Sequence, residues 1–95
     1  MKIFISQPMA GKTIEQIQMK RNAVIETLKL NYPECEILDT FFKDFNGNGV
    51  QFLGKSISML GEADIAVFLN GWEKARGCKI EEMVARLYDI KCLYL

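Results

Sequence analysis

Four short apolar runs alternate with three segments of helical periodicity along this chain. The runs are Lys2–Ser6, Cys35–Leu38, Asp64–Leu69 and Lys91–Leu95. Strands that alternate with helices favour a parallel sheet with right-handed crossovers. We therefore expect one α/β domain over residues 1–95, with a four-stranded parallel sheet in the order 2-1-3-4. Such a domain has three layers and is flavodoxin-like or Rossmann-like, and it binds ligands at the carboxyl ends of its strands.

The first predicted helix has both a start signal and a stop signal. Thr13 is its expected N-cap, Gln16 completes a capping box, and Pro33 ends it. The apolar face of this helix consists of Ile14, Ile17, Val24, Ile25 and Leu28. A shorter second helix is marked by Leu53, Ile57 and Leu60.

A third helix is predicted to begin just after Gly77. Its buried stripe is expected to comprise Ile80, Met83, Val84, Leu87 and Tyr88. Glu82 would then point away from this stripe and pair with Arg86, while Glu81 would lie half covered at its edge. The partial positive charge of a helix N-terminus keeps a nearby carboxylate ionised, which makes Glu81 a candidate nucleophile. Alternatively, both glutamates are acids that the first turn of any helix favours.

The charge of the chain argues against several classes of partner. Twelve acidic and twelve basic residues cancel, so a general nucleic-acid surface is not expected. No apolar run approaches the roughly 20 residues of a membrane span. The N-terminus runs directly into a strand rather than a signal peptide. We therefore expect a cytoplasmic protein without a nucleic-acid or membrane partner.

The chain contains no histidine, which removes Ser-His and Cys-His mechanisms. Its three cysteines have no metal-ligand spacing, so neither a metal nor a cofactor is expected. Cys35 and Cys92 fit core positions, whereas a helix N-terminus could lower the pKa of Cys78. A nucleophilic Cys78 is an alternative to Glu81, although it has no histidine base.

Two loops, 7–12 and 70–76, follow the first and third strands and are expected to face each other across one crevice. Gly11, Lys12 and Thr13 resemble the end of a phosphate-binding P-loop, but Ser6 occupies the place of its first glycine. The first loop can still offer backbone N–H groups and Lys12 to a phosphate. The alternative is a tight turn followed by a helix cap.

Two motifs, together with the Ala63–Asp64 entry to the third strand, make the chain similar to a known family. The motifs are the stretches Phe4–Gly11 and Gly71–Glu81. The chain resembles small bacterial and phage proteins of the nucleoside 2-deoxyribosyltransferase-like superfamily, in a subgroup described as a domain of unknown function. The superfamily includes nucleoside deoxyribosyltransferases and deoxynucleoside 5′-monophosphate N-glycosidases, whose nucleophile is a glutamate four residues after a glycine. The resemblance assigns the nucleophile to Glu81, and sugar or phosphate binding to Ser6, Gln7, Pro8, Met9, Gly11 and Gly77.

The family pattern is changed at two positions of this chain. Ser56 stands where family enzymes have an aspartate that contacts the sugar, and Ala75 replaces a serine before the motif glycine. The general acid that protonates a departing base would then come from elsewhere. Asp39 and Glu73 are the nearby acids that we propose for it.

Three further side chains are candidates for contact with a substrate. Trp72 is placed to stack on a base, or it is a hydrophobic plug in its loop. Arg76 and Lys79 are placed to meet a phosphate, or they are solvated charges.

The leading hypothesis is an N-glycosidase or deoxyribosyltransferase that cleaves the N-glycosidic bond of a nucleoside or nucleotide through Glu81. The alternatives are a catalytically silent nucleotide-binding protein and a dimeric interaction module that uses the loop Phe41–Phe45 as a contact patch. Exposed sheet edges and this loop also predict a homodimer. A Glu81 open to a pocket favours the enzyme, whereas a Glu81 paired with Arg76 or Lys79 favours the other two.

Overall fold

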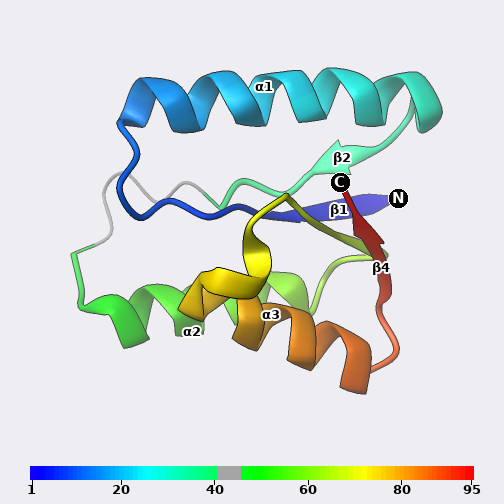
Figure 1. The fold of residues 1–95 in the computed structure, drawn as a ribbon. Coiled ribbons are helices and arrows are strands. Elements are labelled where there is room, and N and C mark those ends of the chain that lie inside the picture. The colour runs from blue at the N-terminus through cyan, green and yellow to red at the C-terminus, as the bar shows by residue number, and fades with distance from the viewer. Residues whose placement is uncertain (41–45) are drawn as a thin grey trace.

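A four-stranded parallel sheet forms the centre of the computed structural model, which describes residues 1–40 and 46–95 (Figure 1). Its strands are β1 (Lys2–Ser6), β2 (Glu36–Ile37), β3 (Ile65–Phe68) and β4 (Lys91–Tyr94). Their order is β2-β1-β3-β4, and every neighbouring pair is parallel. The predicted α/β fold and strand order are therefore confirmed. The phenylalanines of the predicted contact patch fall in 41–45, outside the described residues.

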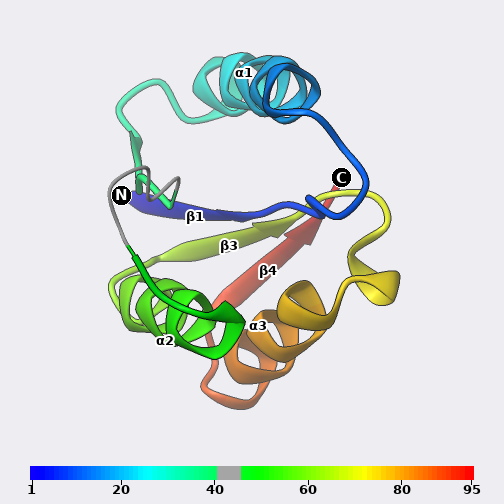
Figure 2. The same cartoon turned by 90° about the vertical axis from the view of Figure 1, so that its left-hand side faces the viewer.

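Helices cover both faces of the sheet and complete a three-layer arrangement (Figure 2). One face carries α1 (Ile14–Asn31), and the other carries α2 (Gly49–Leu60) and α3 (Arg76–Leu87). A short 3-10 turn, η1 (Trp72–Lys74), precedes α3. None of the helices in the described ranges is long and apolar enough to cross a membrane.

The alternation of side chains along β1 divides the core into two clusters. Ile3 and Ile5 face α1, whereas Phe4 faces α2 and α3. The cluster under α1 also contains Val24, Leu28, Ile65, Val67 and Leu69. The cluster under α2 and α3 also contains Leu38, Leu60, Ala66, Phe68 and Ala85. Because side chains alternate along a strand, Ser6 at the end of β1 follows Phe4 toward α3.

The first helix begins and ends as predicted. Thr13 caps α1 through a capping box with Gln16, and the helix ends at Asn31, before Pro33. The apolar face differs at one position, because Ile14 is exposed in the first turn. Arg21 is buried in the helix instead, where its guanidinium donates to the backbone oxygen of Leu38 at 3.1 Å.

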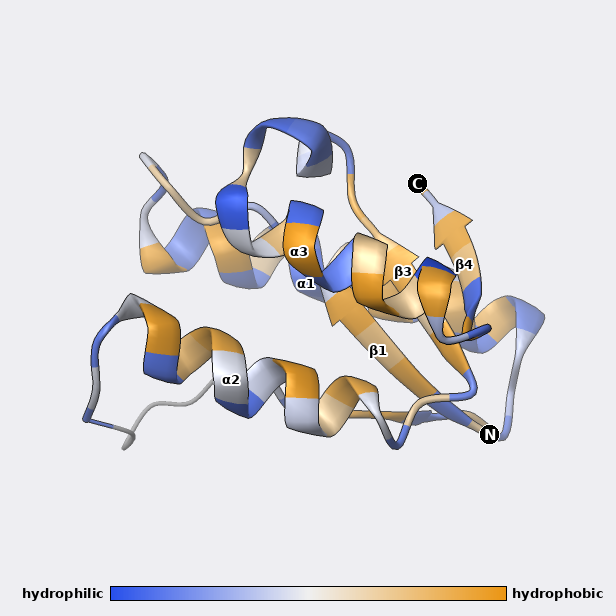
Figure 3. Cartoon of the chain, turned by 90° about the horizontal axis from the view of Figure 1, so that it is seen from below, coloured by the Kyte–Doolittle hydropathy of each residue, from blue (hydrophilic) through white to orange (hydrophobic). Residues whose placement is uncertain are grey.

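The expected buried stripe of α3 is wrong, because the helix is turned the other way. Ile80, Met83, Leu87 and Tyr88 are exposed, and Val84 is only partly buried. The buried residues of α3 are Cys78, Glu81, Glu82 and Ala85. Small Cys78 and Ala85 allow the helix to lie close to the sheet, and both glutamates find hydroxyl donors there. Figure 3 shows hydrophobic residues along α2 and α3, which are neighbours on this face.

Candidate active site

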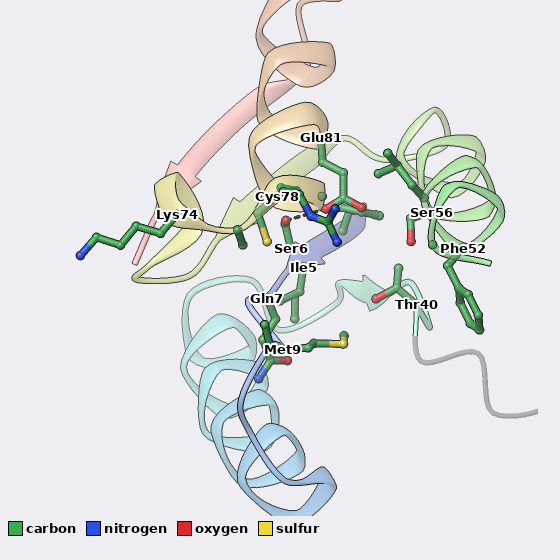
Figure 4. A pocket seen from close by; sticks show the side chains of 17 residues that line it. Ile5, Ser6, Gln7, Met9, Thr40, Phe52, Ser56, Lys74, Cys78 and Glu81 are labelled. Carbon is green, nitrogen blue, oxygen red and sulfur yellow. Dashed lines mark hydrogen bonds between the residues drawn. The ribbon is translucent and has the colours of Figure 1, made fainter. Parts of the chain in front are cut away.

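A short hydrogen bond joins the end of β1 to the second turn of α3. Ser6 Oγ donates to Glu81 Oε1 over 2.6 Å, and both side chains are buried. In Figure 4 the two side chains point toward one another. Glu81 is 8% exposed, so the expectation of a half-covered carboxylate is corrected to a buried one. The site therefore has a carboxylate of fixed orientation at the carboxyl end of a central strand.

Burial raises the pKa of Glu81 above its ordinary value of 4.5, and the hydrogen bond from Ser6 partly lowers that pKa again. Among the described residues, neither Arg76 nor Lys79 forms an ion pair with Glu81. A carboxylate of this kind is less solvated than a surface glutamate when ionised. Such a group is a more effective nucleophile than a hydrated one, once it has lost its proton.

Cys78 lies one turn before Glu81 and is buried. Burial raises the pKa of the Cys78 thiol, and the charge of Glu81 raises it further, while the nearby Ser6 hydroxyl opposes this shift. The expectation that the helix N-terminus would lower this pKa is therefore wrong.

A cavity of about 500 Å³ opens beside Glu81. Its walls come from the end of β1, the loop after it, Thr40 beyond β2, α2, and the chain from Lys74 into α3. Most of the lining is apolar, and Glu81 is the sole carboxylate among the described residues that line the cavity. The lining residues are Phe4, Ile5, Ser6, Gln7, Met9, Ala10, Thr40, Gly49, Phe52, Leu53, Ser56, Lys74, Ala75, Arg76, Gly77, Cys78 and Glu81.

The comparison with family models gives one match, to the domain of unknown function DUF4406 over residues 1–94. The chain belongs to the DUF4406 family. No curated protein and no solved structure matches it.

The cavity of this DUF4406 chain includes about half of the residues predicted for the site. Those that line it are Ser6, Gln7, Met9, Arg76, Gly77 and Glu81. Those that do not line it are Asp39, Glu73, Pro8, Gly11, Lys12, Trp72 and Lys79. Neither acid proposed to protonate a departing base therefore reaches the cavity. Asp39 and Glu73 are both exposed, the first beyond β2 and the second in η1.

Trp72 lies on the outer side of its loop, within an aromatic cluster at the end of the sheet. Its ring centroid is 5.9 Å from that of Phe68 and 5.5 Å from that of Tyr94. This packing agrees with the plug interpretation of Trp72. Nearby, Gly71 has a φ of 95°, and a Cβ on it would lie 3.6 Å from Pro8 Cγ. The two loops thus approach each other, as expected from the strand order.

The helices α1 and α3 differ at their N-termini. The first turn of α1 is occupied by its own cap, because Thr13 Oγ1 accepts from Gln16 N and Gln16 Oε1 accepts from Thr13 N. A tight turn from Met9 to Lys12 precedes it, so the turn-and-cap alternative describes this loop. Ala75, the N-cap of α3, makes no side-chain capping bond. The first N–H groups of α3 are therefore without a side-chain cap where Arg76, Gly77 and Cys78 line the cavity.

Several lining residues were missed by sequence reasoning. Thr40 follows β2, so the rule that ligands meet the carboxyl ends of strands could have indicated it. Phe52 and Leu53 come from α2, and no pattern in the chain predicted which face of that helix borders a cavity. Ser56 of the same helix also lines the cavity, at the position where the resemblance expects a residue that contacts the sugar. The described residues contain no group of three His, Cys, Asp or Glu side chains that could hold a metal ion.

The second glutamate, Glu82, has a separate network that involves β4 and Arg86. Tyr94 OH donates to Glu82 Oε2 at 2.8 Å, and Arg86 Nε lies 3.4 Å from the same oxygen. The predicted pairing of Glu82 with Arg86 is confirmed, but the outward direction of Glu82 is wrong, since this side chain is buried. The hydrogen bond to Glu82 raises the pKa of Tyr94. Glu82 therefore ties β4 to α3 and is absent from the cavity lining.

Proposed function

We propose that this chain cleaves the N-glycosidic bond of a nucleoside or nucleotide, with Glu81 as the nucleophile. The observation that supports this most is a buried carboxylate, oriented by a serine hydroxyl, beside a cavity whose described lining is mainly apolar. A cavity of about 500 Å³ is in the usual range for small ligands. The resemblance of the chain to deoxyribosyltransferases and N-glycosidases suggests the same chemistry.

In the proposed reaction, an oxygen of Glu81 attacks the anomeric carbon as the bond to the base nitrogen breaks. The bonding electron pair leaves with the base, which takes a proton from water at the cavity mouth, because Glu81 is the sole carboxylate among the described residues that line the cavity. A water molecule, or a free base, then attacks the glycosyl-enzyme ester. Attack by water releases the sugar and regenerates Glu81, while its proton passes to solvent.

The start of α3 favours a nucleotide over a nucleoside. Ala75 leaves the first turn without a side-chain cap, and Lys74 and Arg76 lie beside it at the cavity. Helix N-termini bind phosphate through free N–H groups and the helix dipole. We place the 5′-phosphate there, away from Glu81, because two negative groups in contact would repel.

The experiment compares two matched variants, Glu81→Gln and Glu82→Gln. Both replace a buried glutamate of α3 by its neutral isostere, but only the first borders the cavity. A panel of deoxynucleosides and deoxynucleoside 5′-monophosphates is scored for free base by chromatography. We expect release by wild type and Glu82→Gln, and a loss of at least about a thousandfold in Glu81→Gln. Equal release by both variants would reject Glu81, and nucleotide binding without release would favour the silent binding protein.

We also propose that the chain forms a homodimer whose interface is the outward face of α3. Ile80, Met83, Leu87 and Tyr88 follow a helical repeat, yet all four are exposed. Such a contiguous apolar stripe typically marks an interface, whereas single exposed apolar residues need no partner. Analytical ultracentrifugation tests this proposal, and a monomer at high micromolar concentration would reject it.

A further inference from the structure

Gln7 has one end of its side-chain amide engaged and the other end unpartnered. Its Nε2 donates to the backbone oxygen of Ile17 in α1 at 2.9 Å. Its Oε1 is buried and has no hydrogen-bond partner among the described residues. The residue is 7% exposed and forms part of the cavity wall.

The orientation of this amide is determined by its partner. Turning it over would place Oε1 against the Ile17 oxygen, and two acceptors cannot bond to each other. Nε2 is therefore the atom held against α1, and Oε1 is the unpartnered atom of this amide. A buried acceptor without a partner costs folding free energy, so natural proteins rarely retain one unless it has a role.

We infer that Gln7 Oε1 accepts a hydrogen bond from a hydroxyl group on the sugar of the bound ligand. This inference rests on the proposed function for the position of the sugar. If Glu81 attacks the anomeric carbon, the sugar ring lies against Ser6 and Glu81, and Gln7 is the next residue after Ser6. Hydroxyl groups are the hydrogen-bond donors of a sugar ring. A phosphate at neutral pH offers mainly acceptors and would be repelled by Oε1.

Because Oε1 is buried, a ligand reaches it only if a neighbouring side chain moves. Met9 lines the cavity on the same loop as Gln7, and the two side chains lie at the same end of the cavity in Figure 4. Met9 is partly exposed and has three rotatable bonds, so it can change rotamer at low cost. Binding then exchanges an unpaired acceptor for a paired one, which makes the hydroxyl a feature that the site selects.

The test is a thermodynamic cycle that combines one substitution in the protein with one change in the ligand. Dissociation constants are measured for 2′-deoxyadenosine 5′-monophosphate and 2′,3′-dideoxyadenosine 5′-monophosphate, which differ by a single hydroxyl. The proteins are Glu81→Gln and Glu81→Gln/Gln7→Met, because a chain without the nucleophile does not consume the ligand. We expect the hydroxyl to improve affinity about tenfold when Gln7 is present, and to make less than about a twofold difference when it is replaced.

A purely structural role of Gln7 predicts a different result. Losing the bond to Ile17 would weaken both nucleotides equally and leave their ratio unchanged, which would overturn the inference. Binding of neither nucleotide, or equal affinity for both in the Glu81→Gln chain, would also overturn it. If the hydroxyl effect depends on Gln7 but the wild-type protein releases no base, the Gln7 inference is retained and the proposed chemistry is rejected.

Two further measurements complete the experiment. Binding of 2-deoxyribose 5-phosphate, which has no base, should also weaken in Gln7→Met. An unchanged affinity would show that the donor to Gln7 belongs to the base, and it would overturn the inference of a sugar hydroxyl. If Gln7→Met does not fold, the side-chain carbonyl carbon of Gln7 is followed by NMR in the Glu81→Gln chain. Its chemical shift should respond to the deoxynucleotide more than to the dideoxynucleotide, and equal responses would overturn the inference.

Discussion

Ser6 Oγ and Glu81 Oε1 lie 2.6 Å apart although their residues are separated by 75 positions in the chain. The contact arises because β1 is central and ends beneath the second turn of α3. A hydroxyl has one proton, and in this arrangement Ser6 gives it to the carboxylate. The pKa of Glu81 therefore depends on the Ser6 hydroxyl, and removing that hydroxyl is expected to alter it.

Replacing Glu81 by glutamine should remove a pH dependence of stability. The pKa of Glu81 is raised in the folded chain, so the folded state holds a proton that the unfolded state releases above its ordinary pKa of 4.5. The stabilisation from this proton is complete below that value and is lost as the pH rises through the raised pKa. Urea unfolding between about pH 4 and pH 8 should therefore show wild type losing stability relative to Glu81→Gln as the pH rises. A constant difference between the two would contradict the shift.

Ser6→Ala should shift the pH profile of base release. Without the hydroxyl, Glu81 loses the hydrogen bond that opposes the effect of burial, so its pKa rises further. The acidic limb of kcat/KM should move to higher pH, and activity at neutral pH should fall by about tenfold or more. Ser6→Thr keeps a hydroxyl and is the matched control. An unshifted limb in Ser6→Ala would show that Ser6 does not tune the nucleophile.

Cys78→Ala should retain base release, because burial leaves the Cys78 thiol neutral and Glu81 carries the proposed attack. We expect activity within about fivefold of wild type and a cost of about 1 kcal/mol in stability for the lost sulfur. Chromatography of free base and urea unfolding measure the two effects. Complete loss of release in a folded Cys78→Ala chain would revive the nucleophilic thiol as the alternative.

Tyr94→Phe should destabilise the fold without affecting the cavity. The change removes the hydrogen-bond donor of the buried Glu82, at a cost of about 1 kcal/mol. Glu82→Gln leaves a neutral amide oxygen that accepts this bond more weakly. Tyr94→Phe and Glu82→Gln should therefore be less than additive when combined, because both act on the same bond. Full additivity in urea unfolding would show that the bond contributes nothing.

Leu87→Glu should dissociate the proposed dimer and hardly change the stability of the monomer. Leu87 is 63% exposed on α3, and Leu30→Glu on α1 is the matched control at a site that is 84% exposed. An exposed position usually tolerates such a change within about 0.5 kcal/mol. Ultracentrifugation should show a monomer for the first variant and an unchanged dimer for the second. Two dimers would exclude the α3 stripe as the interface.

The sequence was sufficient to predict the layers of the fold, but it was insufficient to predict which face of α3 is buried. The apolar runs, the Thr13 cap and the Pro33 stop set the order and the main helix boundaries because these signals are local. For α3, the larger apolar residues follow a helical repeat that predicted the wrong face. The glutamate face is buried instead, because hydroxyls on Ser6 and Tyr94, outside the helix, donate hydrogen bonds to Glu81 and Glu82. Such long-range partners are invisible to periodicity.

In the candidate site, too, residues marked by a local pattern were predicted and the others were not. Glu81 and the loop after β1 were found because the carboxyl ends of parallel strands meet at one edge. Of the wall contributed by α2, only Ser56 was indicated, through the family resemblance, since Phe52 has no local pattern that marks a ligand. Asp39 and Glu73 were chosen as acids because they follow the second and third strands, and their side chains are outside the cavity lining.

The packing of Trp72 has a spectroscopic consequence. The chain has one tryptophan, and its ring packs against both Phe68 and Tyr94, three residues before the N-cap of α3. Its emission is therefore sensitive to whether β3, β4 and the entry to α3 are assembled. Because Trp72 lies outside the cavity lining, a ligand would not quench it by direct contact. A change in emission on ligand addition would then report movement of the loop that leads into α3.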